Sequence, residues 1–172
     1  MKKIITLFAF VSFLAISGCS SSDDNFQEDN DTIPEAFEIK ANFTVDGNNT
    51  YVISDSFSRY LSGDLFQNES VLIYRLDATN GLGSDVWQLI PNTLPFTNGD
   101  RLTYDFNFSK EDFTIFATGN FNLSARPSYL NAQVFRIVII QLDLAASVDT
   151  SNYNEVMNTL KLSESQVRKV KL

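Results

Sequence analysis

Apolar residues occupy every second position in two stretches of this chain, and this alternation limits the fold more than any other feature. The first stretch places five apolar side chains on one face: Phe37, Ile39, Ala41, Phe43 and Val45. The second stretch does the same with Leu102, Tyr104, Phe106 and Phe108. Successive side chains of a strand point to opposite faces of the sheet, so this period of two predicts β-strands with one buried face.

Turn residues separate these strands from further ones. Asp46 and Gly47 tolerate positive φ, so we expect the first stretch to form a hairpin with residues 51–53. Residues 71–78 and 85–90 flank a segment containing two glycines and an asparagine, which predicts a second hairpin.

The middle of the chain completes the predicted fold. Residues 133–142 are apolar on both faces, which predicts a strand covered on both sides. Pro91 and Pro95 bracket a predicted loop, because proline lacks the N–H that a central strand needs. We therefore expect an all-β domain over residues 36–172, an antiparallel β-sandwich that is immunoglobulin-like or jelly-roll-like.

A helical period appears only near the C-terminus. Four apolar residues fall at the spacing i, i+3, i+4 and i+7, namely Tyr153, Val156, Met157 and Leu160. They predict a short amphipathic helix around residues 152–161, with Thr150 or Ser151 as its cap. Ser163 and Gln166 have the spacing of a further capped turn. Residues 163–172 fit a helix or a strand.

The N-terminus has the layout of a secretory signal. Two lysines precede an apolar run over residues 4–16, which is shorter than the roughly 20 residues needed to span a bilayer. The run ends in a sequence that resembles the bacterial lipobox, with Ile16, Ser17 and Gly18 before Cys19. We expect residues 1–18 to be a cleaved signal peptide and Cys19 to become the acylated, palmitate-bearing first residue. The alternative is an ordinary signal peptide with a chance cysteine.

A polar segment follows the cysteine. Residues 19–35 are rich in Ser, Asp, Asn and Glu, and they predict a disordered, flexible tether that reaches about 20 Å. Its Ser/Asp tract at residues 20–24 resembles the surface-export signal of Bacteroidota lipoproteins. We expect the protein to be lipid-anchored in the outer membrane and exposed at the cell surface, with a periplasm-facing anchor as the alternative.

The residue inventory excludes several classes of function. The chain has no histidine, which removes Ser-His-Asp and Cys-His catalysis and histidine-based zinc sites. Its single cysteine is assigned to lipid, so neither a thiol nucleophile nor a disulfide remains. Gly-rich phosphate loops are missing, and a formal net charge of −8 argues against nucleic acid as a partner. We expect no cofactor and no metal.

Three side chains in the predicted strands are candidates for a specific role. Trp87 and Tyr74 form either a glycan-stacking platform or part of the core, and the core is favoured for the single tryptophan of a sandwich. Arg136 interrupts the apolar run and should pair with a carboxylate, because an unpaired buried charge is costly. Ligand binding by Arg136 is the alternative.

Five runs of sequence resemble a family of small cell-surface lipoproteins of flavobacteria and other Bacteroidota, and they lie at residues 71–76, 86–91, 104–108, 119–123 and 133–139. The resemblance covers about residues 36–142. Some relatives carry a collagen-like linker ahead of the same domain, where this chain has a short Ser/Asp tether. The family has no established activity, so the resemblance implies a surface lipoprotein and assigns no catalytic residue.

These observations favour a non-catalytic surface module that binds a glycan or a neighbouring envelope protein. A second hypothesis is a hydrolase or lyase acting on glycans, which would use two of seven aspartates: Asp55, Asp64, Asp77, Asp85, Asp100, Asp105 and Asp112. A third is a structural component of an envelope assembly.

Surface display makes a first testable prediction. Protease added to intact cells should remove the domain, because an outer-leaflet anchor leaves it outside the permeability barrier. The measurement is an immunoblot of cells before and after shaving. A domain that resists the protease until the outer membrane is permeabilised would contradict surface display.

Overall fold

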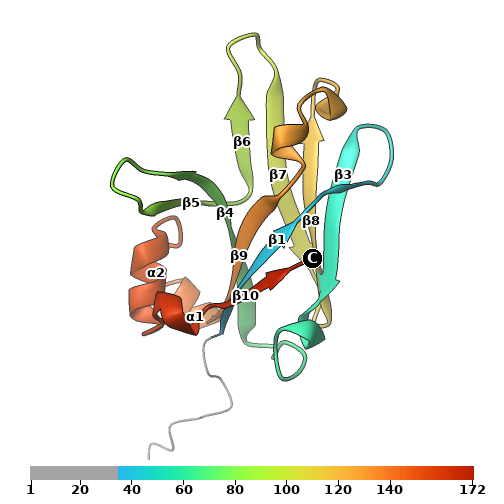
Figure 1. The fold of residues 1–172 in the computed structure, drawn as a ribbon. Coiled ribbons are helices and arrows are strands. Elements are labelled where there is room, and N and C mark those ends of the chain that lie inside the picture. Colours follow the sequence, from blue (N-terminus) through green and yellow to red (C-terminus); the bar gives the residue numbers. More distant parts are fainter. Residues whose placement is uncertain (1–34) are drawn as a thin grey trace, which may run out of the picture. The chain divides into compact units, whose positions relative to one another are not determined.

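Two five-stranded sheets pack face to face in the computed structural model, which describes residues 35–172 (Figure 1). The first sheet, here the β9 sheet, has the strand order β10 (Arg168–Lys171), β1 (Ala36–Ala41), β9 (Gln133–Gln141), β4 (Glu69–Thr79) and β5 (Asp85–Leu89). The second, the β8 sheet, has the order β2 (Thr44–Val45), β3 (Thr50–Ser56), β8 (Asp112–Gly119), β7 (Arg101–Phe108) and β6 (Asn92–Pro95). The predicted all-β sandwich is confirmed.

Short helical elements connect these strands. The α-helices are α1 (Leu142–Ala145) and α2 (Tyr153–Thr159), and 3-10 turns occur at Phe57–Arg59, Leu123–Ala125, Pro127–Tyr129 and Glu164–Gln166. Within residues 35–172, no helix has both the length and the apolar character to cross a membrane. The predictions for the N-terminal segment concern residues outside the described range, up to residue 34. They are the signal peptide, the lipobox of Ile16, Ser17 and Gly18, the acylation of Cys19 and the tether.

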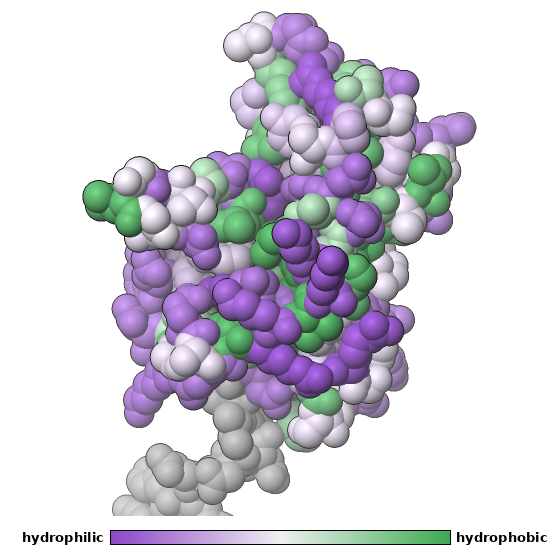
Figure 2. Space-filling model, in the orientation of Figure 1, coloured by the Kyte–Doolittle hydropathy of each residue, from purple (hydrophilic) through white to green (hydrophobic). Residues whose placement is uncertain are grey.

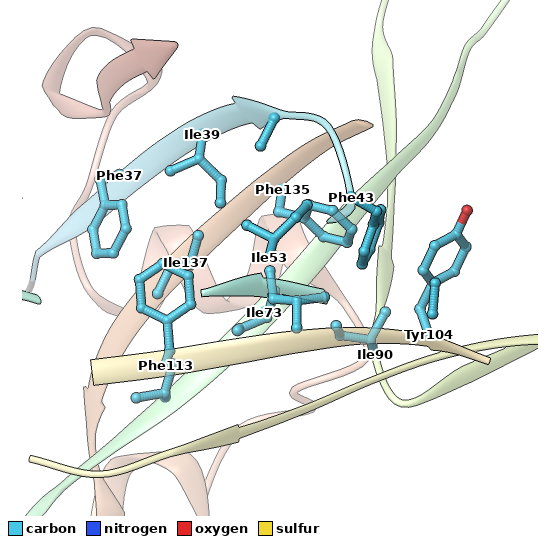
Figure 3. Packing of buried hydrophobic residues seen from close by; sticks show 14 of the residues in the cluster. Phe37, Ile39, Phe43, Ile53, Ile73, Ile90, Tyr104, Phe113, Phe135 and Ile137 are labelled. Carbon is cyan, nitrogen blue, oxygen red and sulfur yellow. The ribbon is translucent and has the colours of Figure 1, made fainter. Parts of the chain in front are cut away.

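The main core lies between the two sheets, and it explains the alternating sequence. Phe37 and Ile39 of β1 point toward Phe113 of β8 and Ile53 of β3, and all four are buried (Figure 3). Phe37 also stacks on Tyr60, with ring centroids 4.1 Å apart. Because every second residue of a strand faces this layer, the two-residue period in the sequence is the period of core contacts.

A second core covers the opposite face of the β9 sheet. Val138 and Ile140 of β9 pack with Val156 and Met157 of α2, and all four are buried. Strand β9 therefore has a sheet on one side and the C-terminal segment on the other, which confirms the prediction from its two apolar faces. The hairpin of β4 and β5 is also confirmed, with register pairs such as Tyr74 and Leu89.

The prediction of a single strand over residues 37–45 is wrong, because the chain changes sheets in the middle of it. Strand β1 ends at Ala41, and β2 belongs to the β8 sheet, where it pairs with β3 over only two residue pairs. Phe43 stays buried at the crossing, and its N–H donates to the Leu130 carbonyl at 2.9 Å. Both sheets share one core, so the alternation continues across the crossing as far as Phe43, and Val45 is exposed.

The loop predicted between Pro91 and Pro95 is also wrong. These residues include β6, which pairs with β7 in the register Asn92 with Tyr104 and Pro95 with Arg101. Strand β6 is the last strand of its sheet, so it has a neighbour on one side only. A proline is tolerated there, because an edge strand does not need every N–H for the ladder.

The C-terminal segment settles the alternatives left open for residues 163–172. A 3-10 turn with the predicted Ser163 and Gln166 capping box leads into β10, which runs parallel to β1. Helix α2 is present as predicted, but its cap is Asn152, whose side chain accepts from the Glu155 N–H. Hydrophilic side chains gather over β1 and β10 (Figure 2), and charged residues on a short edge strand oppose pairing with another chain.

The shared core predicts where the fold is most sensitive to truncation. Ile137→Ala should lower the free energy of unfolding by about 2–5 kcal/mol, because the side chain is fully buried between the sheets and leaves a cavity. Urea unfolding measures the change. Leu82→Ala at the exposed tip of the β4–β5 hairpin is the control, and it should change the free energy by less than about 0.5 kcal/mol. Equal effects would contradict the assigned core.

Candidate functional site

Arg136 lies on the outer face of β9, under the C-terminal segment, and is completely buried. Its Nη2 donates to Glu38 Oε2 at 2.5 Å, and its Nη1 donates to the two carboxylate oxygens of Glu164 at 2.8 and 2.7 Å. Nη1 also donates to the Tyr153 hydroxyl, which donates to Glu164 Oε1 at 2.8 Å. We expected a carboxylate partner for Arg136, and the structure places two beside it.

The hydrogen bonds of this cluster stabilise the charged forms of Arg136 and Glu164. Burial opposes the charge of Arg136, but hydrogen bonds to Glu38, Tyr153 and Glu164 outweigh it, so the pKa of Arg136 lies above its ordinary value. Partial burial likewise opposes the Glu164 carboxylate, and its bonds to Tyr153 and Arg136 hold its pKa below the usual range. Burial raises the pKa of the Tyr153 hydroxyl, which stays protonated as a donor.

Of the two roles considered for Trp87 and Tyr74, a glycan-stacking platform or part of the core, the position of Tyr74 matches the core. Tyr74 is fully buried, and its hydroxyl donates to the Thr150 carbonyl at 2.7 Å. The ring of Trp87 is half-buried, lies 4.2 Å from the Arg136 guanidinium and packs 5.6 Å from Tyr153. The rings of Trp87 and Tyr153 therefore help to enclose the Arg136 charge, and Tyr74, which packs edge-on against Tyr153, has no free face for a ligand.

A shallow groove remains beside Trp87. It has a volume of about 430 Å³ and lies between β5 and the start of α2, where Asp85, Trp87, Asn152 and Asn154 line it. Trp87, one of the two residues of the predicted platform, therefore lines a concave surface. Its ring also packs against Arg136, so it has a structural role as well.

A second polar concavity forms at one end of the sandwich, around Arg75. We call it the Arg75 cleft. It has a volume of about 430 Å³, and its polar lining consists of Arg75, Asp77, Thr79, Ser128, Tyr129 and Gln133. Strand β4 supplies the first three of these residues, β9 supplies Gln133, and the turn Pro127–Tyr129 supplies the rest.

The buried parts of this cleft are held firmly. Arg75 is only 6% exposed, its guanidinium lies 4.8 Å from the centre of the Tyr104 ring, and its Nη2 donates to Asp77 Oδ1 at 2.5 Å. Gln133 Nε2 donates to the carbonyls of Ser128 and Asn131 at 2.8 and 2.9 Å, which fixes the turn that forms the rim. A rigid floor of this kind costs little entropy when a ligand binds.

The cleft presents donors and acceptors side by side. Arg75 supplies N–H donors in a planar fork, and Asp77, whose side chain is 37% exposed, supplies a carboxylate acceptor in contact with it. Burial raises the pKa of the Tyr104 hydroxyl, which donates to the Tyr129 carbonyl at 2.7 Å and so remains protonated. Such a site suits a neutral ligand with several hydroxyl groups, each of which donates and accepts hydrogen bonds.

The structure separates most of the aspartates of the enzyme hypothesis. Asp55, Asp77 and Asp100 pair with three different arginines, Asp85 accepts from Thr79, and Asp112 accepts from Ser109. Four concave sites, including the two above, each hold a single carboxylate among their lining residues. Among residues 35–172 no group of three Asp, Glu, Cys or His side chains is placed to hold a metal. A pair of facing acids, which the enzyme hypothesis requires, is not found in these four sites.

Arg75 is not among the site residues predicted from the sequence. The sequence does contain one indication that Arg75 is buried. It stands on the same strand face as Val71 and Ile73, both of which are buried in the main core. The same signal marks Arg136, so it identifies a buried charge without telling a structural arginine from one that lines a cleft.

Comparisons with protein-family models, with curated proteins and with solved structures give no match to this chain. The resemblance to flavobacterial surface lipoproteins therefore stays a prediction from the sequence.

Removing the buried charge at residue 136 should destabilise the protein. Arg136→Met leaves the largely buried carboxylate of Glu38 without its main partner, so the free energy of unfolding should fall by about 3 kcal/mol. Urea unfolding measures the loss. Arg101→Met is the control, because Arg101 is exposed and its loss leaves no buried carboxylate without a partner, so it should cost less than about 0.5 kcal/mol. Similar losses in the two variants would contradict the central role of Arg136.

Acid should weaken the same cluster through Glu164. The pKa of this carboxyl in the folded protein lies below its ordinary value of 4.5, so the folded state binds this proton less readily than the unfolded state. The resulting stabilisation is present above pH 4.5 and is lost as the pH falls through the lowered pKa. Urea unfolding as a function of pH should therefore show that the advantage of the wild type over Glu164→Gln shrinks on acidification. A constant difference would contradict the assignment.

Proposed function

We propose that this protein is a lipid-anchored, non-catalytic binding module of the bacterial outer membrane, which displays the Arg75 cleft at the cell surface to bind a neutral glycan. The anchor is the predicted acylation of Cys19 after the lipobox Ile16, Ser17 and Gly18. Two or more acyl chains hold a protein stably on a membrane without a spanning helix. The proposal requires no cofactor and no metal.

The single observation that carries the glycan assignment is the polar cleft with a buried arginine at its floor. The guanidinium of Arg75 and the carboxylate of Asp77 are in contact, so the cleft offers strong donors and acceptors with no net charge from this pair. Two neighbouring hydroxyls of a sugar match such a pair, because one accepts from the arginine while the other donates to the carboxylate. The ring of Tyr129, which is only partly exposed, provides an apolar surface at the rim.

The absence of histidine supports a binding role over a catalytic one. Without histidine or a free thiol, an enzyme would depend on facing carboxylates, and the Arg75 cleft contributes only Asp77. The acidic balance of the chain favours a neutral ligand over a polyanion.

Blocking the cleft tests this proposal. Thr79→Trp should abolish glycan binding, because the new ring fills the concavity from an exposed position at the end of β4 without removing a buried contact. Arg75→Lys should weaken binding about tenfold or more, since lysine keeps the charge but loses the planar fork. The measurement is a glycan array followed by calorimetry with the best-bound sugar.

Thr118→Trp is the matched control, because Thr118 is an exposed strand threonine of β8 that does not line the cleft. It should bind like the wild type. Glycan binding that survives Thr79→Trp would contradict the assignment of the cleft. Failure of the wild type to bind any sugar, together with capture of an envelope protein from outer-membrane extracts, would replace the glycan with a protein ligand.

A further inference from the structure

An exposed apolar groove lies at the other end of the sandwich from the Arg75 cleft. We call it the Phe66 groove. Phe66 is 53% exposed and Phe108 is 41% exposed, and the two line a groove of about 470 Å³ together with Leu65, Glu69 and Lys110. Leu142, also largely exposed, borders this end, because its N–H donates to the Asn68 carbonyl at 2.8 Å.

Strand β4 connects the two ends. Glu69, its first residue, lines the Phe66 groove, and Arg75 lies six residues further along the same strand. At about 3.3 Å per residue the two positions are about 20 Å apart. Strand β9 runs antiparallel beside it, with Gln133 in the Arg75 cleft and Gln141 paired with Glu69.

The chain enters the described domain at the end that carries the Phe66 groove. The Glu35 carbonyl accepts from the N–H of Ile139, and Ile139 pairs with Val71, two residues from Glu69. Burial and the nearby charge of Glu69 raise the pKa of the Glu35 carboxyl, in keeping with this proximity. Glu35, where the described domain begins, therefore lies at the same end as the groove.

We propose that the Phe66 groove rests on the lipid bilayer, with the rings of Phe66 and Phe108 inserted at the level of the headgroups. This inference relies on the proposed acylation of Cys19, which precedes Glu35 by sixteen residues. The tether predicted from the sequence reaches about 20 Å, so it confines the groove to the membrane surface at a high effective concentration.

The chemistry of the groove fits a zwitterionic lipid surface. Apolar side chains that face water at a membrane-proximal end are stabilised by insertion into the interface. Lys110 and Glu69 give the groove one cation and one anion, so it matches headgroups that carry both charges and does not require anionic lipid. This orientation points the Arg75 cleft away from the membrane.

Hydrogen exchange on vesicles tests the proposal. The full acylated protein is reconstituted in phosphatidylcholine vesicles and compared with the unacylated Cys19→Ser chain in solution. Exchange in residues 60–68 and 108–112 should slow at least threefold on the vesicles, while residues 126–132 beside the Arg75 cleft should be unchanged. In the acylated Phe66→Ser/Phe108→Ser variant the slowing should disappear.

Acylated Leu82→Ser is the matched control, because Leu82 is a more exposed apolar residue at the hairpin tip, and it should retain the slowing. Intact-protein mass spectrometry reports whether Cys19 is acylated, so it separates the proposed lipid anchor from the proposed membrane contact of the groove. An acylated protein whose groove segments exchange at the solution rate overturns the membrane contact and leaves the anchor intact. A mass without acyl chains overturns both. Protection that depends on protein concentration in vesicle-free solution would assign the groove to a second copy and overturn the lipid contact.

Discussion

The buried guanidinium of Arg136 is the interaction on which the arrangement of this domain depends. A charge removed from water is tolerated only where hydrogen-bonded partners surround it. Here Glu38 comes from β1, Tyr153 from α2, Glu164 from the turn before β10, and the ring of Trp87 from β5. Because these partners lie far apart in the sequence, the two terminal nitrogens of the guanidinium find all of their hydrogen-bond acceptors only when the C-terminal segment is packed against the outer face of the sheet. The second core and the cluster therefore depend on the same packing.

A different arginine defines the surface that we assign to ligand binding. Arg75 is nearly as buried as Arg136, but its partner Asp77 lies at the surface and the space beside it is open. The Arg75 cleft and the Phe66 groove lie at opposite ends of β4. A lipid anchor that holds the Phe66 groove against the membrane, as we propose, would turn the Arg75 cleft outward.

Much of the fold follows from local patterns, and the errors have physical causes. The alternation from Leu102 to Phe106 and the helical spacing from Tyr153 to Leu160 each reflect contact with a single core layer, and both elements formed where predicted. Phe108 continues the alternation at the end of its strand but is exposed. The strand predicted over residues 37–45 failed because one core serves two sheets, so alternation alone cannot show where the chain crosses between them. The loop predicted at residues 91–95 failed because a proline is excluded from central strands only, and the position of a strand in its sheet is not a local property.

The sequence by itself determined the all-β class, the short C-terminal helix and the lack of histidine, because each depends on residue type and spacing along the chain. The lipobox that ends at Cys19 is predicted on the same basis. Only the tertiary structure decided that Arg136 is enclosed while Arg75 lines a cleft, and that Tyr74 is buried. Both arginines stand in apolar strands and look alike in the sequence. Their surroundings differ because Glu164 lies 28 residues from Arg136 along the chain, whereas Asp77 lies two residues from Arg75. The distant partner covers Arg136 with the C-terminal segment that carries it, whereas the partner on the same strand leaves the space beside Arg75 open.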